Sequence, residues 1–373
     1  MEKIELKKFQ FLYLMILVSL NSCFGQEFKY RNVSNVPYFV QKLDEQKERI
    51  NLLNADNYVD ATEYLPKNFV NDASVDYTAY LQKAINENSN IKLPNFPVLI
   101  SDSGLDIQND RKIVFDSNSR LILKASDKTN YEILRIHSKR NIVVFSPKIT
   151  GDRKIHIGQK GEWGMGISIK SSENVKIINS NINDCWGDGI YLGQSGNVTN
   201  KNIILNYGIL DNNRRNAISV ISSNGLVISN LILSNTNGTN PQTGLDFEPN
   251  SNNEVLDDIE VKNLYTFNNA KQGVFFVLGN LNGGVNKVGI KMDTHADRYS
   301  VRSIAYLYKG NKKSKAINSN KLGGNITLSN ITSANSKYPF QVFDGSEQND
   351  IQITVKPVDK KGYKSYDDFI KLE

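Results

Sequence analysis

The chain has 373 residues and a formal net charge of +6 at pH 7, of which residues 1–25 contribute +1. This mild excess fits an anionic glycan as partner, but lysines and acids are interleaved throughout, so a solvated surface without partner specificity is the plainer interpretation. No nucleic-acid partner is predicted. Beyond Cys23 the sequence contains one cysteine, Cys185, which excludes an intrachain disulfide in the mature protein. Length alone would allow two compact domains, but repeat folds do not follow that rule, because each repeat contacts only its neighbours.

The N-terminus has the pattern of an export signal. Three lysines, the last of them Lys8, precede an apolar run over residues 9–20 that is too short to span a membrane. The sequence ending at Cys23 resembles a bacterial lipobox, whereas residues 23–25 also suit ordinary cleavage before Gln26. We therefore expect a signal peptide over 1–25 or a lipoprotein signal over 1–22. The protein is then secreted, periplasmic, or a surface lipoprotein that contacts a membrane only through lipidated Cys23.

Residues 26–71 form an N-terminal extension in which 41–53 have helical spacing. From residue 72 the pattern changes. Residues 76–86 predict a short amphipathic helix, and 91–94 and 96–100 predict strands interrupted by proline. A stack of strands needs its end covered, so we expect this helix to cap a domain over residues 72–358. A charged loop is predicted at 309–321, and the tail at 359–373 includes a candidate helix over 363–373.

One strand pattern recurs through the middle of the chain. Aligned apolar residues stand 23, 28, 27 and 29 residues apart, within the range of repeats that stack into solenoids. The aligned residues are Ile167, Ile190, Ile218, Leu245 and Val274. A second strand follows about ten residues later and usually a third, which predicts three parallel sheets. β-branched residues and the absence of leucine-rich spacing argue against a leucine-rich horseshoe.

Asparagines are frequent between the strands, where their side chains satisfy backbone groups in tight turns and tolerate positive φ. Stacked turns of this kind predict asparagine ladders. The residues concerned are Asn179, Asn181, Asn183, Asn212, Asn213, Asn235 and Asn237.

A family resemblance rests on two segments, the Asp-x-Thr-x-x-Leu-Gln-x-Ala-Ile pattern of residues 76–85 and the Trp-Gly-Asp-Gly-Ile pattern of residues 186–190. Together with the repeats, they resemble the pectin-lyase-like superfamily over about residues 70–355. The resemblance implies an all-β fold, a single-stranded right-handed parallel β-helix with a short N-terminal capping helix, and activity on polysaccharides. The sequence departs from the polygalacturonase pattern, because Asp188 stands alone and neither Gly-His-Gly nor Arg-x-Lys is present.

Alternation along the repeated strand places one residue of each coil on its outer face, which we expect to be exposed to solvent. These residues are Ser168, Tyr191, Ser219, Asp246 and Phe275. Glu248 shares the outer face with Asp246, and two residues along a strand separate their carboxyl groups by about 6–9 Å. That spacing lets an inverting glycosidase seat a water between acid and base. Two solvated acids are the plainer interpretation.

Other candidates are predicted to converge on the same stripe. Asp188 opens the strand two coils earlier, and Arg214 and Arg215 enter the coil between, where arginines can bind a carboxylate or sulfate. A loop carrying Glu162 and Trp163 precedes these coils. Trp163, Trp186, Tyr191 and Phe275 have aromatic faces that suit sugar rings, although filling space between coils is the more frequent role. Cys185 is expected to pack inside a turn.

The chain's three histidines are widely separated, so no zinc site and no resident cofactor are predicted. Three functions remain open. The first is a glycoside hydrolase in which Asp246 and Glu248 divide the acid and base roles, Asp188 assists, and Arg214 and Arg215 hold an anionic group. The second is a lyase with Arg214 or Arg215 as base, whose acids would bind calcium. The third is a non-catalytic glycan-binding surface protein.

Overall fold

A computed structural model describes residues 28–308, 322–343 and 350–355. The chain divides into two units, Met1–Arg31 and Asn32–Glu373. Of the first unit, residues 28–31 are described and contain no helix or strand. The predicted signal peptide, the loop at 309–321 and the tail at 359–373 lie outside the described residues. Within the described residues, no helix is long and apolar enough to cross a membrane.

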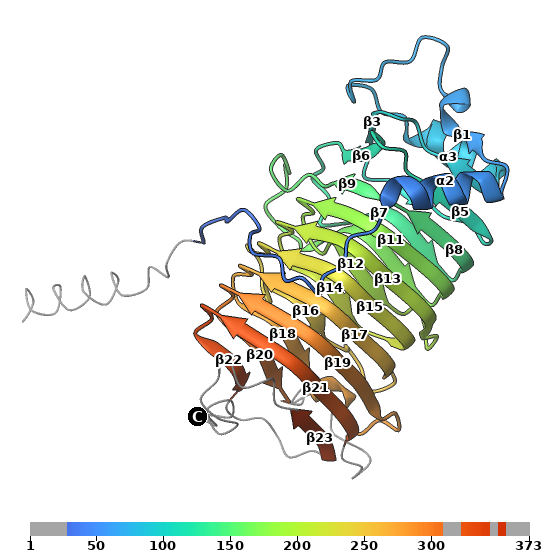
Figure 1. The fold of residues 1–373 in the computed structure, drawn as a ribbon. Helices are drawn as coiled ribbons and strands as arrows, with labels where there is room; N and C mark the ends of the chain where they lie inside the picture. The colour runs from blue at the N-terminus through green and yellow to red at the C-terminus, as the bar shows by residue number, and fades with distance from the viewer. Residues whose placement is uncertain (1–27, 309–321, 344–349, 356–373) are drawn as a thin grey trace, which may run out of the picture. The chain divides into compact units, whose positions relative to one another are not determined.

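Helices occur mainly before the repeats. Within the described part of the chain, the helices are α2 (Glu45–Ala55), the 3₁₀ helix η1 (Ala61–Tyr64), α3 (Thr78–Glu87) and the 3₁₀ helix η2 (Gly279–Leu281). Helix α3 confirms the predicted helix over 76–86. The Asp76 carboxylate accepts a hydrogen bond from the Thr78 amide at 2.9 Å, and α3 buries Leu81, Ala84 and Ile85 in the core of the first coils (Figure 1).

The repeats form two parallel sheets. The nine-stranded sheet, here called sheet B, contains the predicted recurrent strand. Its members are β4 (Leu105–Asp106), β7 (Asn130–His137), β10 (Trp163–Lys170), β12 (Ile190–Gly193), β14 (Asn216–Val220), β16 (Thr243–Phe247), β18 (Gln272–Val277), β20 (Arg302–Leu307) and β22 (Tyr338–Val342).

The fourteen-stranded sheet, sheet A, forms the broad set of arrows across the centre of Figure 1. It comprises β1 (Val59–Asp60), β2 (Asn90–Lys92), β3 (Pro97–Ile100), β5 (Arg111–Val114), β6 (Arg120–Leu123), β8 (Arg140–Phe145), β9 (Lys148–Thr150), β11 (Glu173–Asn183), β13 (Asn200–Asp211), β15 (Ser223–Ser234), β17 (Leu256–Phe267), β19 (Val288–Arg298), β21 (Gly323–Ala334) and β23 (Asp350–Val355).

The predicted count of three separate strands per coil is wrong for most coils. From β11 onward, the second and third strands are two arms of one long strand that bends at a residue with positive φ, such as Asn179, Asn230 or Asn263. The bend keeps the hydrogen-bonded ladder continuous around the corner, so two sheets result instead of three. In the earlier coil the corresponding arms are separate, because β8 and β9 both pair with β11.

Asparagine ladders run along the corners, as predicted. The Asn212 amide donates to the Asp184 carboxylate at 2.6 Å, and the Asn237 amide donates to the Asn212 side-chain oxygen at 3.3 Å. Asn212 and Asn235 both have positive φ. Their side chains thus satisfy polar groups in turns whose backbone conformation most residues avoid.

The core fills the inside of the coils. Ile167, Ile190, Ile218 and Leu245 are completely buried and stack in register. A small residue precedes most of them because the next coil approaches closely. An added Cβ at Gly189 would lie 2.7 Å from the Ala217 carbonyl oxygen, so a larger side chain there would force the coils apart.

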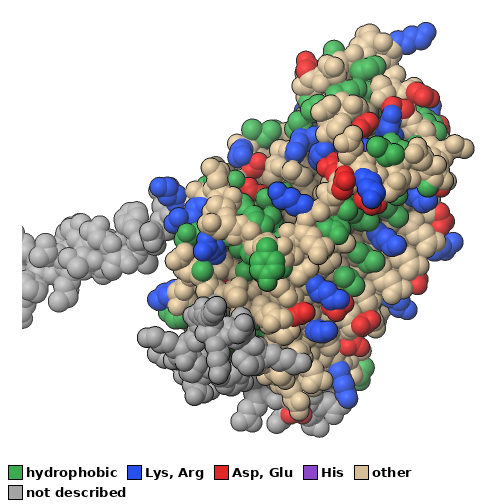
Figure 2. Space-filling view, in the orientation of Figure 1, with side chains coloured by type: hydrophobic (Ala, Val, Ile, Leu, Met, Phe, Trp, Pro, Cys, Tyr) green, Lys and Arg blue, Asp and Glu red, His purple; other side chains and the backbone are tan. Residues whose placement is uncertain are grey.

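A segment before α2 packs on the outer face of sheet A. Val40 is buried with Tyr265 and Phe267, and the Tyr265 hydroxyl donates to the Ser34 carbonyl at 2.9 Å. On the face in Figure 2, basic and acidic side chains are interspersed rather than gathered by sign. The +6 charge therefore does not form one basic field on that face.

Candidate active site

The outer residues of sheet B form a column in the predicted register. Ser168 pairs with Tyr191, Tyr191 with Ser219, Ser219 with Asp246, and Asp246 with Phe275. The spacing of the sequence repeats thus predicts which side chains become neighbours on successive coils.

The predicted exposure of this column is wrong. Ser168, Ser219 and Asp246 are completely buried, and Phe275 is buried as well. The side chains do project away from the core, but long polar neighbours from adjacent coils fold back over them. This covering turns an expected solvated stripe into a desolvated polar layer, in which charge interactions are stronger than at a surface.

Arg215 links two of the predicted acids. One guanidinium nitrogen lies 3.2 Å from an Asp188 carboxylate oxygen, and the other lies 2.7 Å from a Glu248 carboxylate oxygen. The Asp188 side chain has no exposed surface, the Arg215 side chain is 12% exposed, and Glu248 is 28% exposed. Glu248 is therefore the member of this bridge that reaches solvent.

Two uncharged residues complete the cluster, and the sequence analysis did not identify either as functional. The Asn216 amide donates to Asp246 at 3.0 Å and to the Ser219 hydroxyl at 2.9 Å, while the Ser219 hydroxyl donates to Asp188 at 2.8 Å. The Asn216 backbone N–H also donates to Asp188, at 3.1 Å. Asn216 follows Asp188 by 28 residues, so an alignment of the coils would have placed Asn216 at the position of Asp188 in the next coil.

Burial controls the ionisation of the acids. It raises the pKa of Asp188, against the opposing effect of Arg215. Burial raises the pKa of Asp246 well above its ordinary value, and the charge of Glu248 raises it further. One Asp246 oxygen has no hydrogen-bond partner within the described residues. The surroundings of Asp246 therefore favour its protonated form.

The two acids on one strand influence each other electrostatically. Burial and then the charge of Glu248 raise the pKa of Asp246, and Arg215 opposes them. Arg215 holds Glu248 by a contact of 2.7 Å, whereas Asp246 accepts a hydrogen bond from Asn216 at 3.0 Å. The spacing of about 6–9 Å between the two carboxyl groups stays a prediction.

Arg214 does not join the acids, which corrects the prediction of an arginine pair acting together. Its guanidinium stacks 3.8 Å from the centre of the Trp186 ring and donates to the Gly161 carbonyl at 2.9 Å. Arg214 and Arg215 lie in a bend just before β14, and their side chains diverge there. The other face of Trp186 stacks on His156 at 3.9 Å. Trp186 is thus covered on both faces and is not available to a sugar.

The loop candidates lie beside the Arg214 stack. Trp163 begins β10 and is 48% exposed, so its ring remains accessible for stacking. Glu162 lies close enough to Arg214 for its charge to raise the pKa of that arginine, which burial lowers. Tyr191 is partly buried, and burial together with the charge of Asp188 raises its pKa to about 12.

No group of three or more His, Cys, Asp or Glu among the described residues is arranged to hold a metal ion. The sequence prediction had allowed calcium at Asp188, Asp246 and Glu248 for a lyase. Two of these acids are paired with Arg215 instead. Cys185 is completely buried, as predicted.

Comparisons with known proteins identify the fold but not the reaction. No family model matches the chain. Uncharacterized protein YclG of Bacillus subtilis is 26% identical over 162 residues, and the SPbeta prophage-derived uncharacterized protein YorA of the same organism is 25% identical over 162 residues. Each match covers 39% of this chain and 28% of the relative, so this chain spans little more than a quarter of their length.

Solved structures match over most of the chain. A 1,3-α-1,4-β-D-galactose-4-sulfate-3,6-anhydro-D-galactose-2-sulfate 4 galactohydrolase has a TM-score of 0.59 at 12% identity, covering 80% of this chain and 86% of that one. PfbA, a surface adhesin of Streptococcus pneumoniae, has a TM-score of 0.50 at 12% identity, covering 80% and 82%. At such identities the likeness concerns the fold. This chain has a right-handed parallel β-helix fold, as the family resemblance implies.

Proposed function

We propose that this protein is an exported glycoside hydrolase that cleaves an anionic polysaccharide with the carboxyl pair Asp246 and Glu248. The observation that carries the proposal is the combination of a buried acid, whose pKa burial raises, with a partly exposed acid on the outer face of sheet B. Glycosidic bond cleavage needs one carboxyl group to protonate the leaving oxygen and one carboxylate to act as base or nucleophile. The fold likeness to a galactohydrolase supports a polysaccharide as the substrate class.

The two acids have unequal access to a glycan. Glu248 is the acid that a bound chain can contact, whereas Asp246 is completely buried behind it. In this scheme a proton passes from Asp246 through Glu248 to the leaving oxygen, and the attacking water returns a proton to the pair as its oxygen bonds to the sugar. Arg215 fixes the Glu248 carboxylate, and Asp188, held by Ser219 and Asn216, fixes Arg215. Arg215 and Asp188 act in this scheme as positioning residues.

The rival lyase reaction requires a base that can lose its proton. Arg215 lies between two carboxylates, which raise its pKa above that of an ordinary arginine. Arg214 donates hydrogen bonds to two backbone carbonyls. The carboxylates therefore hold Arg215 in the protonated form, and the contacts of Arg214 with Trp186 and with backbone carbonyls keep it apart from the acids. This arrangement favours hydrolysis over β-elimination.

The test is incubation of the exported chain with a panel of acidic polysaccharides while reducing ends and ultraviolet absorbance are measured together. We expect reducing ends without the absorbance of an unsaturated product. Asp246→Asn and Glu248→Gln should each lower the rate by about 100-fold or more. Glu260→Gln is the matched control, because Glu260 lies on sheet A and pairs with Lys262.

The pH profile provides a second readout. A rate that depends on the Asp246 proton should fall as pH rises through the raised pKa of that carboxyl. Absorbance of an unsaturated product would mean that the enzyme is a lyase and not a hydrolase. Glycan binding without cleavage under any condition would support the non-catalytic surface protein.

A further inference from the structure

We infer that Lys170 and His137 form a subsite for a negatively charged group of the glycan, on the same face of sheet B as the acid pair. The inference rests on the proposed function, because only that function identifies the ligand as a glycan. Lys170 and His137 then take the anion-binding role that the sequence assigned to Arg214 and Arg215. Arg215 is held by Asp188 and Glu248, and Arg214 is held by Trp186 and backbone carbonyls. Both guanidinium groups are therefore already engaged by other groups of this chain.

Register places this subsite at a defined distance from the acids. Lys170 pairs with His137 on one side and with Gly193 on the other. The same row continues through Ile221 to Glu248, whose backbone contacts follow the neighbouring strands. Lys170 therefore lies three strand spacings from Glu248, or about 14 Å along the face. A polysaccharide that reaches both residues must run along the stack of coils.

The Tyr191 ring lies on the face of sheet B between Lys170 and Glu248. A Cβ at Gly193 would lie 2.3 Å from a Tyr191 ring carbon, so the ring lies over Gly193 and only glycine leaves room for it there. The Lys170 ammonium lies 5.6 Å from the centre of the same ring. An aromatic ring flanked by a cation on one side and by the acids on the other offers a surface for a sugar residue between the two sites.

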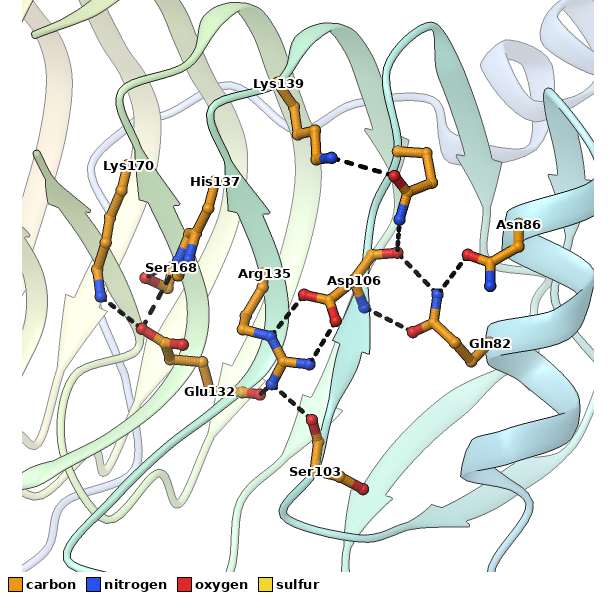
Figure 3. Close-up of polar contacts among 11 residues, drawn as sticks. Gln82, Asn86, Ser103, Asp106, Glu132, Arg135, His137, Lys139, Ser168 and Lys170 are labelled. Carbon is orange, nitrogen blue, oxygen red and sulfur yellow. Dashed lines mark hydrogen bonds and ion pairs between the residues drawn. The ribbon is translucent and has the colours of Figure 1, made fainter. Parts of the chain in front are cut away.

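The polar contacts leave donors for an anion. Figure 3 shows Lys170 and His137 on neighbouring strands with Glu132 and Ser168 between them. One ammonium hydrogen bond goes to Glu132, at 2.7 Å, and an ammonium group has three donors. His137 directs Nε2 at Ser168, 3.0 Å away, and at Glu132, 3.6 Å away. Its Nδ1 is on the opposite edge of the ring.

Arg135 next to this cluster is not the anchor. Its guanidinium donates to both Asp106 oxygens, at 2.7 and 2.9 Å, and to the Ser103 carbonyl at 2.5 Å (Figure 3). Arg135 therefore uses these donors on Asp106 and Ser103. Lys170 is paired with Glu132 by a single contact, its side chain is 26% exposed, and that of His137 is 32% exposed.

The charges around His137 make the subsite sensitive to pH. Burial lowers the His137 pKa, Lys170 and Arg135 lower it further, and Glu132 and Asp106 oppose them. His137 is therefore neutral at pH 7. An anion bound between Lys170 and His137 favours the protonated ring, so binding should raise the His137 pKa, and affinity should rise as pH falls through it.

The test is direct binding to the full chain by calorimetry, with three hexasaccharide probes that carry uronate groups, sulfate groups or no charge. We expect one charged probe to bind, and its affinity to fall about tenfold in Lys170→Met, the effect of one lost ion contact in a partly buried site. Lys291→Met is the matched control, since Lys291 lies on sheet A and also faces a glutamate. Comparison of the two charged probes distinguishes carboxylate from sulfate.

Two further variants are expected to change binding in other ways than Lys170→Met. Glu132→Gln removes the anion that competes for Lys170 and should strengthen binding of the same probe, while His137→Gln should abolish the pH dependence. Equal affinity of wild type and Lys170→Met, or equal loss for the uncharged probe, would overturn the subsite. Because the readout is binding, Lys170-dependent affinity in a protein that cleaves nothing would refute the hydrolase and leave the subsite in place.

Discussion

Replacing Arg215 by methionine tests the electrostatics of the acid cluster most directly. The variant removes the cation that lies between the fully buried Asp188 and the partly exposed Glu248. Loss of one partner from a buried ion pair costs about 3–5 kcal/mol, because the remaining charge is left without compensation. Glu248 can turn to water, so nearly all of this cost should come from Asp188.

The cost should depend on pH in a known direction. Burial raises the folded-state pKa of Asp188 even with Arg215 present, and removal of the arginine raises it further. A carboxyl group whose folded pKa exceeds its unfolded pKa adds stability below the unfolded value, about 4, and loses that contribution as pH rises through the folded value. The difference in unfolding free energy between Arg215→Met and wild type should therefore be largest at pH 7 and shrink toward pH 4.

Urea unfolding followed by tryptophan fluorescence measures this difference, since the chain has only two tryptophans, Trp163 and Trp186. Adding Asp188→Asn to Arg215→Met should restore most of the loss at pH 7, because the amide still accepts the Ser219 hydrogen bond without a charge. A destabilisation below about 1 kcal/mol, typical of a surface ion pair, would refute the reasoning. So would a loss that is the same at both pH values.

Four further outcomes are expected. Gly189→Val should destabilise the fold by about 1–3 kcal/mol, more than Ala217→Gly, in thermal unfolding. Burial raises the pKa of Asp297 to about 6, so this carboxyl group stabilises the fold below pH 4 and loses that contribution as pH rises through 6. In urea unfolding, Asp297→Asn should remove about 3 kcal/mol of the pH dependence of the unfolding free energy. Cys185, whose burial raises its pKa, should react with thiol reagents only after unfolding. Chelation of calcium should leave the thermal midpoint unchanged, and a calcium-induced rise that Glu248→Gln abolishes would contradict the pairing with Arg215.

The repeat pattern predicts most of the fold because each coil repeats the same physical constraint. Apolar residues at positions such as Ile190 and Ile218 fix the register, and the structure pairs these same residues. The number of sheets was not predictable from the strands alone. Whether two arms separated by an asparagine form one bent strand depends on the φ of a residue such as Asn230, and its neighbours in the next coils decide that conformation.

The site was predictable only in part. Alternation and spacing place Asp188, Asp246, Glu248 and Arg215 on one stripe, and the structure links Arg215 to Asp188 and to Glu248. Asn216 and Ser219, which donate to the acids, were not identified as functional. The burial of the acids does not follow from alternation, because it depends on the side chains around them. The divergence of Arg214 does not follow from it either, since both arginines lie in a bend before β14.

The position of Arg215 bears on all three candidate functions together. A lyase needs a cation that can lose a proton or be replaced by calcium, and a purely structural protein has no use for a desolvated acid pair, which costs stability. Burial of Asp188 and Asp246 is unfavourable for folding, yet one coil places Arg215, Asn216 and Ser219 between Asp188 of the preceding coil and Asp246 of the following one. An energetically costly, well-supported acid cluster beside a partly exposed glutamate is the arrangement expected where proton transfer is required.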